Sequence, residues 1–167
     1  MATNVHIARA ESLDQIDEVR RLFREYERFL DVDLCFQSFE EELAALPGKY
    51  APPDGALLIA ADERRSAGCV ALRKLEDGVC EMKRLFVRPQ YRGRGLGRLL
   101  AERIVSEATA LGYKVMRLDT LDKLKEAMAL YESLGFKRRD PYYDNPLPGV
   151  EYWELDLGRQ RHRQRVV

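Results

Sequence analysis

The chain has 167 residues, 46% of them hydrophobic and 34% charged, a composition typical of a soluble globular protein with one buried core. Lysine plus arginine number 28, as do aspartate plus glutamate, so the surface lacks the basic excess of a non-specific nucleic-acid binder and no nucleic-acid partner is expected. Three cysteines without a CxxC pair, no leader pattern and no membrane-length apolar run predict a cytoplasmic protein without disulfides, metal or membrane contact.

The N-terminal third is expected to form one strand and two helices. Residues 5–10 form the strand, and Ser12 with Gln15 gives the capping-box pattern that begins a helix. The apolar residues of this helix recur at helical spacing and are Leu13, Ile16, Val19, Phe23, Tyr26 and Leu30. A short second helix is expected over residues 38–46, and the prolines and glycines of residues 46–55 indicate a loop.

Three strands and a long helix are expected in the middle of the chain. The turn sequences RRSAG and EDG separate strands over residues 56–61, 68–75 and 79–87, which form an antiparallel meander. A helix then begins near Gly95 and ends at Gly112. The stripe that this helix is expected to bury consists of Leu96, Leu99, Leu100, Ile104, Ala108 and Leu111.

The C-terminal third is expected to add three strands and one helix. The strands cover residues 114–120, 136–139 and 150–157, and the helix covers residues 123–134. The order along the chain is therefore βααβββαβαββ. The basic tail from residue 158 is expected to be unstructured.

A loop with three alternating glycines joins the last strand of the meander to the long helix. It reads VRPQYRGRGLG over residues 87–97. Gly93, Gly95 and Gly97 allow backbone conformations closed to residues with a Cβ and let the chain approach a ligand closely. The first N–H groups of the following helix have no internal partner and carry the positive end of its dipole. The loop therefore predicts a site for an anionic ligand.

Neither common nucleotide-binding pattern fits this loop. A P-loop needs Lys and then Ser or Thr after the last glycine, where Arg98 and Leu99 stand, and a dinucleotide-binding fold needs the loop after the first strand of a long parallel sheet. The pattern that fits is Arg-x-x-Gly-x-Gly, formed by Arg92, Gly95 and Gly97. It resembles the coenzyme A pyrophosphate loop of the GNAT (Gcn5-related N-acetyltransferase) superfamily.

A second segment, ALYESLGF over residues 129–136, is similar to the last conserved segment of the same superfamily. The two matches together cover residues 81–136 closely and residues 55–157 loosely. The resemblance implies an α/β (α+β) fold with a mixed, mostly antiparallel seven-stranded sheet and helices on both faces. It also implies a single N-acetyltransferase domain over residues 1–157, acetyl-CoA as co-substrate and no metal.

The resemblance further implies where coenzyme A binds. In the family the acetyl thioester lies between the fourth and fifth strands, which separate and here are residues 79–87 and 114–120. Backbone groups that would hold the pantetheine arm and the thioester carbonyl belong to Leu85, Phe86 and Val87. Backbone amides that would hold the pyrophosphate belong to Gly93, Arg94, Gly95, Leu96, Gly97 and Arg98. The side chains of Arg92, Arg94 and Arg98 would add positive charge, or else form only a solvated helix start.

Tyr131 falls where the family has a tyrosine thought to protonate the departing thiolate of coenzyme A, which leaves more easily as a thiol. The alternative is a packed core aromatic, because Tyr131 shares a helix stripe with Leu124 and Met128.

Glu81 stands six residues before Val87, where some family members have a glutamate that removes a proton from the attacking amine. In an otherwise apolar strand its pKa would be raised, which suits a base. The alternative is a salt bridge with Lys83 or Arg84.

The sequence departs from the family at Leu124, where many members carry an asparagine that contacts the cofactor. Either this contact is missing, or Thr120, at the end of its strand, makes it instead. The resemblance also implies that the acceptor enters from the side opposite coenzyme A, here against residues 29–42 and 138–150. Both segments mix aromatic residues with carboxylates, which suits a small cationic amine, although an ordinary acidic helix and a proline-rich turn would have the same composition.

The leading hypothesis is an acetyl-CoA-dependent N-acetyltransferase that acts on a primary amine of a small molecule or peptide by direct attack in a ternary complex. One alternative is a non-catalytic acyl-CoA-binding or interaction module, which would need neither Glu81 nor Tyr131. Another is a nucleic-acid binder that uses RGRG and the tail, against which the balanced charge speaks. The amine, the acyl chain and the oligomeric state stay open, a homodimer included.

Overall fold

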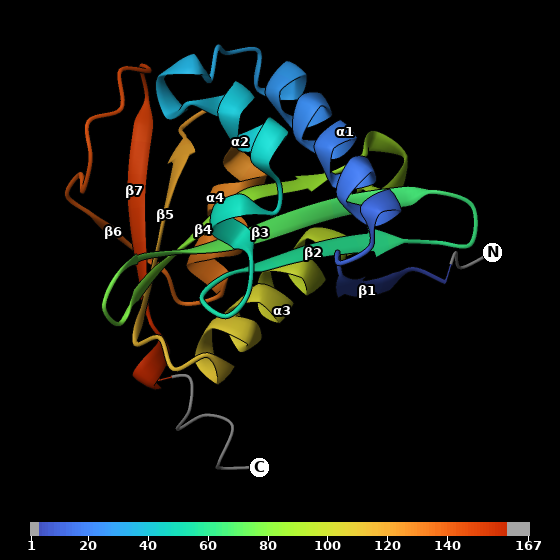
Figure 1. Cartoon of the computed structure of the whole chain (residues 1–167). Coiled ribbons are helices and arrows are strands. Elements are labelled where there is room, and N and C mark those ends of the chain that lie inside the picture. The colour runs from blue at the N-terminus through green and yellow to red at the C-terminus, as the bar shows by residue number, and fades with distance from the viewer. Residues whose placement is uncertain (1–3, 160–167) are drawn as a thin grey trace.

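The computed structural model describes residues 4–159, and its centre is one seven-stranded sheet with the spatial order β1-β2-β3-β4-β5-β7-β6 (Figure 1). The strands are β1 (His6–Arg9), β2 (Ala56–Ala61), β3 (Ser66–Glu76), β4 (Val79–Val87), β5 (Val115–Leu121), β6 (Lys137–Arg139) and β7 (Val150–Asp156). Neighbouring strands are antiparallel except β4 and β5, which run parallel. The mixed, mostly antiparallel sheet that the family resemblance implied is confirmed.

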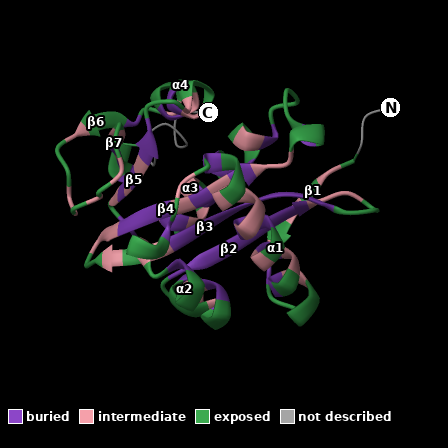
Figure 2. Cartoon of the chain, turned by 90° about the horizontal axis from the view of Figure 1, so that it is seen from above, coloured by how far each residue is buried: buried purple, intermediate pink, exposed green. Residues whose placement is uncertain are grey.

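Helices cover both faces of this sheet, as expected (Figure 1). In the described part of the chain, the longer α-helices are α1 (Leu13–Leu30), α2 (Phe39–Ala45), α3 (Leu96–Ala110) and α4 (Lys125–Ser133), and the short 3-10 turns are η1 (Cys35–Gln37), η2 (Gly48–Tyr50) and η3 (Pro89–Tyr91). Along β2, Leu57 and Ile59 pack with α1 and α2, whereas Leu58 and Ala60 pack with α3, because successive side chains on a strand point to opposite faces. Figure 2 shows the buried residues running along β2, β3 and β4 between the two helical layers.

The predicted helices and strands are all present, and their ends differ by only one or two residues from those expected. The capping box that begins α1 is confirmed, because Ser12 accepts a hydrogen bond from the backbone of Gln15 and Gln15 accepts one from the backbone of Ser12, both at 3.1 Å. Residues 157–159 form a helical turn after β7. The first two residues of the tail, which were expected to be unstructured, are therefore helical. The rest of the tail, residues 160–167, lies outside the described residues.

Burial differs from the predicted helix stripes at three leucines. Leu13 is 85% exposed at the first position of α1, and Leu99 and Leu111 of the α3 region are 53% and 38% exposed. Leu100 takes the core-facing position that Leu99 was expected to share, because adjacent residues lie about 100° apart around a helix. Leu111 is the C-cap residue and follows the last helical turn. Within residues 4–159, no helix has both the length and the apolar character needed to cross a membrane.

The parallel pair of strands β4 and β5 is joined only at its beginning. The ladder ends at the pair Glu81–Arg117 after three residue pairs. Shortly beyond that point Arg84 has a φ of 62°, in the left-handed region, and the register between β3 and β4 shifts. A non-glycine residue in this region stores about 1–3 kcal/mol of strain, so the surrounding structure must hold it there. This bulge accompanies the separation of β4 from β5.

The guanidinium of Arg84 ties the bulge to helix α2. Its Nε and Nη2 donate to the two carboxylate oxygens of Glu42 at 3.0 and 3.1 Å, and it lies 5.1 Å from the ring centre of Phe39. The Arg84 side chain is only 3% exposed. A buried, bidentate pair of this kind fixes direction as well as charge.

We expect Glu42→Gln to lower the free energy of unfolding by about 3 kcal/mol, because the buried guanidinium of Arg84 loses its counter-charge. Urea unfolding followed by circular dichroism measures this loss. Glu41→Gln, at the exposed neighbouring position of α2, is the control and should change stability by less than about 0.5 kcal/mol. Equal stability of the two variants would show that the pair does not hold the bulge.

Candidate active site

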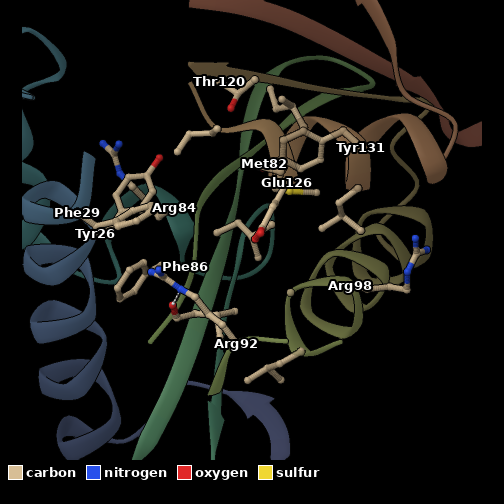
Figure 3. Close-up of a pocket in the computed structure, with 18 of the residues that line it drawn as sticks. Tyr26, Phe29, Met82, Arg84, Phe86, Arg92, Arg98, Thr120, Glu126 and Tyr131 are labelled. Carbon is tan, nitrogen blue, oxygen red and sulfur yellow. Dashed lines mark hydrogen bonds between the residues drawn. The ribbon is translucent and has the colours of Figure 1, made fainter. Parts of the chain in front are cut away.

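A cavity of about 550 Å³ lies where β4 and β5 separate, and we call it the first cavity (Figure 3). Its walls come from α1, the end of β4, the glycine loop, the start of α3, the end of β5 and helix α4. The predicted site residues that line it are Leu85, Phe86, Val87, Arg92, Gly93, Gly95, Leu96, Gly97, Arg98, Thr120 and Tyr131. Arg94 and Glu81 are not in the lining. Segments far apart in the sequence are thus brought together as the two motifs predicted.

The glycine loop has the expected backbone at two of its three glycines. Gly93 and Gly95 have φ values of +76° and +78°, and a Cβ at either position would meet no atom within 4 Å. Backbone conformation, and not crowding inside the protein, therefore favours glycine there. Gly97 differs from the expectation, because it lies in the first turn of α3 and its φ is not positive. A Cβ on Gly97 would make ordinary contacts with Val87 and Leu130, at 3.9 and 4.0 Å, so the fold itself does not require glycine.

Helix α3 points its N-terminus at the first cavity. The N-cap residue is Gly95, and no side chain caps the first turn. Leu96, Gly97 and Arg98 form that turn and line the cavity. Their backbone N–H groups lie where an α-helix has no internal acceptors and where its dipole favours negative charge. The predicted anion-binding geometry is therefore present.

The arginines near this helix start are engaged with the protein. Arg92 Nε donates to the carbonyl of Val87 at 2.9 Å, and its guanidinium lies 4.4 Å from the ring centre of Phe29 (Figure 3). Arg98 donates to Ser133 Oγ at 2.6 Å and so links α3 to α4. Both arginines line the first cavity. A direct contact of either side chain with phosphate stays a prediction, and the backbone of the loop is the larger source of donors.

Tyr131 packs as a core aromatic residue and also reaches the first cavity, and its role as a proton donor stays a prediction. Its ring is 6% exposed and packs 5.7 Å from the ring of Phe136, as a core aromatic would, yet it also lines the first cavity (Figure 3). Burial raises the pKa of the Tyr131 hydroxyl well above its usual range. The hydroxyl is therefore protonated at neutral pH and can act as a donor. Thr120, which is 7% exposed, and Leu124 line the same cavity.

Glu81 is fully buried and belongs to a network of ion pairs and hydrogen bonds. Arg73 Nε donates to Oε1 at 2.8 Å, the Tyr142 hydroxyl donates to Oε2 at 2.6 Å, and Lys83 Nζ lies 3.6 Å from Oε1. Burial alone would raise the pKa of Glu81, but the charges of Lys83 and Arg73 and the two hydrogen bonds outweigh it and lower the pKa. The expected raised pKa is therefore wrong. Of the two expected salt-bridge partners Lys83 is present, and Arg84 pairs with Glu42 instead.

A second cavity of about 560 Å³ lies beside η1, α2 and η2. Its lining is Phe36, Gln37, Ser38, Glu41, Glu42, Ala45, Pro47, Gly48, Lys49, Tyr50, Arg73, Lys83 and Tyr143. Parts of both segments expected to face the acceptor, residues 29–42 and 138–150, thus line this cavity. Two of the carboxylates in the first segment are engaged elsewhere, because Glu40 pairs with Arg24 and Glu42 with Arg84.

Sequence reasoning did not predict, as site residues, several polar side chains that line the two cavities or form hydrogen bonds with residues lining them. Asp119 lines the first cavity, and its Oδ2 accepts hydrogen bonds from the Tyr143 hydroxyl and, at 3.0 Å, from Asn145 Nδ2. Tyr143 lines the second cavity and accepts a hydrogen bond from Gln37 at 3.0 Å. Tyr143 and Asn145 belong to the loop between β6 and β7. The sequence of this loop has no periodicity from which their contact with Asp119 of β5 could have been predicted. Within residues 4–159, no group of three or more His, Cys, Asp or Glu is arranged to hold a metal ion.

Residues 16–136 match the sequence model of the Acetyltransferase (GNAT) family. The chain belongs to the GNAT family. It is 44% identical over 159 residues to an uncharacterized N-acetyltransferase of Schizosaccharomyces pombe, a match that covers 94% of this chain and 98% of that protein. The resemblance inferred from the two motifs is confirmed, and the family and this relative identify the chain as an N-acetyltransferase.

Solved structures of other proteins have the same fold. An acetyltransferase from Streptococcus agalactiae superposes with a TM-score of 0.76 at 25% identity, covering 91% of this chain and 98% of that one. The Salmonella typhimurium protein yncA, solved with its cofactor acetyl-CoA, superposes with a TM-score of 0.65 at 20% identity, covering 92% of this chain and 94% of that one. These likenesses extend over nearly the whole of this GNAT chain.

Proposed function

We propose that this GNAT protein transfers an acetyl group from acetyl-CoA to a primary amine by direct attack in a ternary complex. The observation that carries the proposal is the first cavity itself, which joins the N-terminus of α3 at the glycine loop to the protonated hydroxyl of Tyr131. The backbone hydrogen-bond donors at the start of α3 suit phosphate groups, and the protonated hydroxyl of Tyr131 suits the sulfur of a thioester. A ligand that contains both groups would fit this cavity. The cofactor of yncA, acetyl-CoA, is such a molecule.

The exposed edge of β4 supports a binding role for its backbone. Past the pair Glu81–Arg117 no further ladder pairs join β4 to β5, so Leu85, Phe86 and Val87 face the first cavity without that partner strand. Backbone N–H and C=O groups need hydrogen-bond partners. Amides of a pantetheine arm would provide them, and the pyrophosphate would then lie at the amides of Gly93 to Arg98.

Tyr131 is the proposed proton donor. Acetyl-CoA supplies the acetyl group as a thioester, which the amine nitrogen attacks. The Tyr131 hydroxyl is protonated at neutral pH and would donate its proton to the departing sulfur, while burial keeps competing water away from the hydroxyl.

For the proton of the acceptor amine, Asp119 is better placed than Glu81. Glu81 does not line the first cavity, both of its oxygens accept hydrogen bonds, and its lowered pKa makes it a weak base. Asp119 lines the first cavity and accepts from Tyr143, which lines the second, so a hydrogen-bonded path joins the two cavities. We therefore assign Glu81 a positioning role, in which it holds the side chains of Arg73 and Tyr142. To Asp119 we assign the role of the base that accepts the proton of the amine.

The first prediction concerns cofactor binding. Gly97→Val should weaken acetyl-CoA binding at least ten-fold in isothermal titration calorimetry, because the added methyl groups enter the cavity wall while the helical backbone tolerates valine. Leu99→Val, at an exposed position of the same helix, is the control and should leave affinity unchanged. If the unmodified protein gave no heat with acetyl-CoA or coenzyme A, the proposed function would be wrong.

The second prediction separates an enzyme from an acyl-CoA-binding module. Tyr131→Phe should keep acetyl-CoA affinity within a few-fold and lower kcat about a hundred-fold, measured as thiol release with the best amine found in a panel. Tyr113→Phe, a buried tyrosine outside the first cavity, is the control. Unchanged turnover in Tyr131→Phe would leave Tyr131 as a packed aromatic only.

The third prediction concerns pH. Because its pKa is lowered below the usual value of a glutamate, Glu81 is ionised at neutral pH and should not titrate in the working range, so the pH–rate profile of Glu81→Gln should parallel that of the unmodified enzyme. Asp119→Asn should instead lower the rate at neutral pH and partly recover at high pH, where more of the amine is unprotonated. If the reaction rate of Glu81→Gln recovered at high pH and that of Asp119→Asn did not, Glu81 would be the base and Asp119 would not.

A further inference from the structure

Lys83 occupies the junction of the two cavities. It is the residue common to both linings, and it lies on β4 between the end of the β5 ladder and the bulge at Arg84. Its side chain is only 9% exposed. A buried ammonium group at this position needs an explanation, because removing such a charge from water is costly unless a partner compensates it.

Among residues 4–159, the hydrogen-bonding and ion-pair partners of Lys83 lie at long distances. Its Nζ lies 3.6 Å from Glu81 Oε1 and 3.4 Å from Gln37 Oε1, whereas hydrogen bonds from an ammonium to a carboxylate are usually about 2.7–2.9 Å long. Burial and the nearby guanidinium of Arg84 lower the pKa of Lys83, which is the signature of a charge that its surroundings do not fully compensate.

The other buried charges around it are matched at close range. Arg84 is held by both oxygens of Glu42, and Glu81 accepts from Arg73 at 2.8 Å and from Tyr142 at 2.6 Å. The charge left without a close partner is therefore that of Lys83.

The second cavity has the size and the charge for a small anionic molecule. Its volume of about 560 Å³ is typical of a small-molecule site. Besides Lys83 it is lined by two ion-paired side chains, Arg73 with Glu81 and Glu42 with Arg84. Its other charged residues, Lys49 and Glu41, are both solvent-exposed, where charge is screened, so the charge that a ligand would meet inside this cavity is that of Lys83.

We propose that the acceptor is an amino acid whose carboxylate binds the ammonium of Lys83 from the second cavity. Because one carbon separates the carboxylate from the amine of an α-amino acid, anchoring it at the junction presents the amine to the first cavity, beside Asp119. A polyamine would place positive charge against Lys83, and the N-terminus of a peptide would bring no carboxylate to it. This inference rests on the proposed function and names its substrate class.

The test compares each amino acid with its C-terminal amide as an acceptor, using the full-length protein, acetyl-CoA and mass-spectrometric detection of the acetylated product. We expect at least one amino acid to be acetylated with a kcat/KM about 100-fold above that of its amide, the scale of a charge-assisted hydrogen bond that one partner loses. Lys83→Met should bring this acid-to-amide ratio close to one, and Lys83→Arg should keep part of it. Lys74→Met, at an exposed lysine outside both cavities, is the matched control.

Thermal unfolding and acetyl-CoA calorimetry on Lys83→Met establish that the variant folds and still binds the cofactor. Equal use of acids and amides by the unmodified enzyme, or activity confined to amines without a carboxylate, would overturn this inference alone. The inference would also be overturned if Lys83→Met lowered kcat/KM for the amino acid and for its amide by the same factor, because Lys83 would then serve the reaction without recognising the carboxylate. Failure of the unmodified protein to bind acetyl-CoA would overturn the proposed function, and the inference with it.

Discussion

The site depends on the short pairing of β4 with β5. Had the ladder continued past Glu81–Arg117, the two strands would have satisfied each other's backbone groups and closed the first cavity. The bulge at Arg84 and its tie to Glu42 accompany the separation, and they connect it to helix α2. Next to this interruption of the sheet, Lys83 lines both cavities.

The two cavities use charge in different ways. At the first cavity an anion would be attracted by backbone N–H groups at the start of α3, while the nearby Arg92 and Arg98 are engaged with Phe29 and Ser133. At the junction the charge is carried by a side chain, Lys83, whose partners are distant. Backbone donors suit a ligand portion shared by a whole family, whereas a side chain can be exchanged when the acceptor changes.

The individual helices and strands and the glycine loop could be predicted because they depend on local properties, whereas the mixed seven-stranded sheet was expected from the family resemblance. Helical and strand periodicity placed the elements to within one or two residues, and positive φ at Gly93 and Gly95 follows from the loop itself. The environment of Glu81 could not be predicted, since Tyr142 is 61 residues away along the chain and only the folded sheet brings the two together. Periodicity also could not choose between Leu99 and Leu100, because which neighbour faces the core depends on how α3 is rotated against the sheet.

The two edges of the sheet limit how copies of this chain can associate. The edge strands β1 and β6 have four and three residues, and β6 consists of Lys137, Arg138 and Arg139. A short edge carrying positive charge is a poor template for an added strand. Joining two sheets edge to edge, and the amyloid-like aggregation that begins in the same way, is therefore disfavoured by the ends of the sheet themselves.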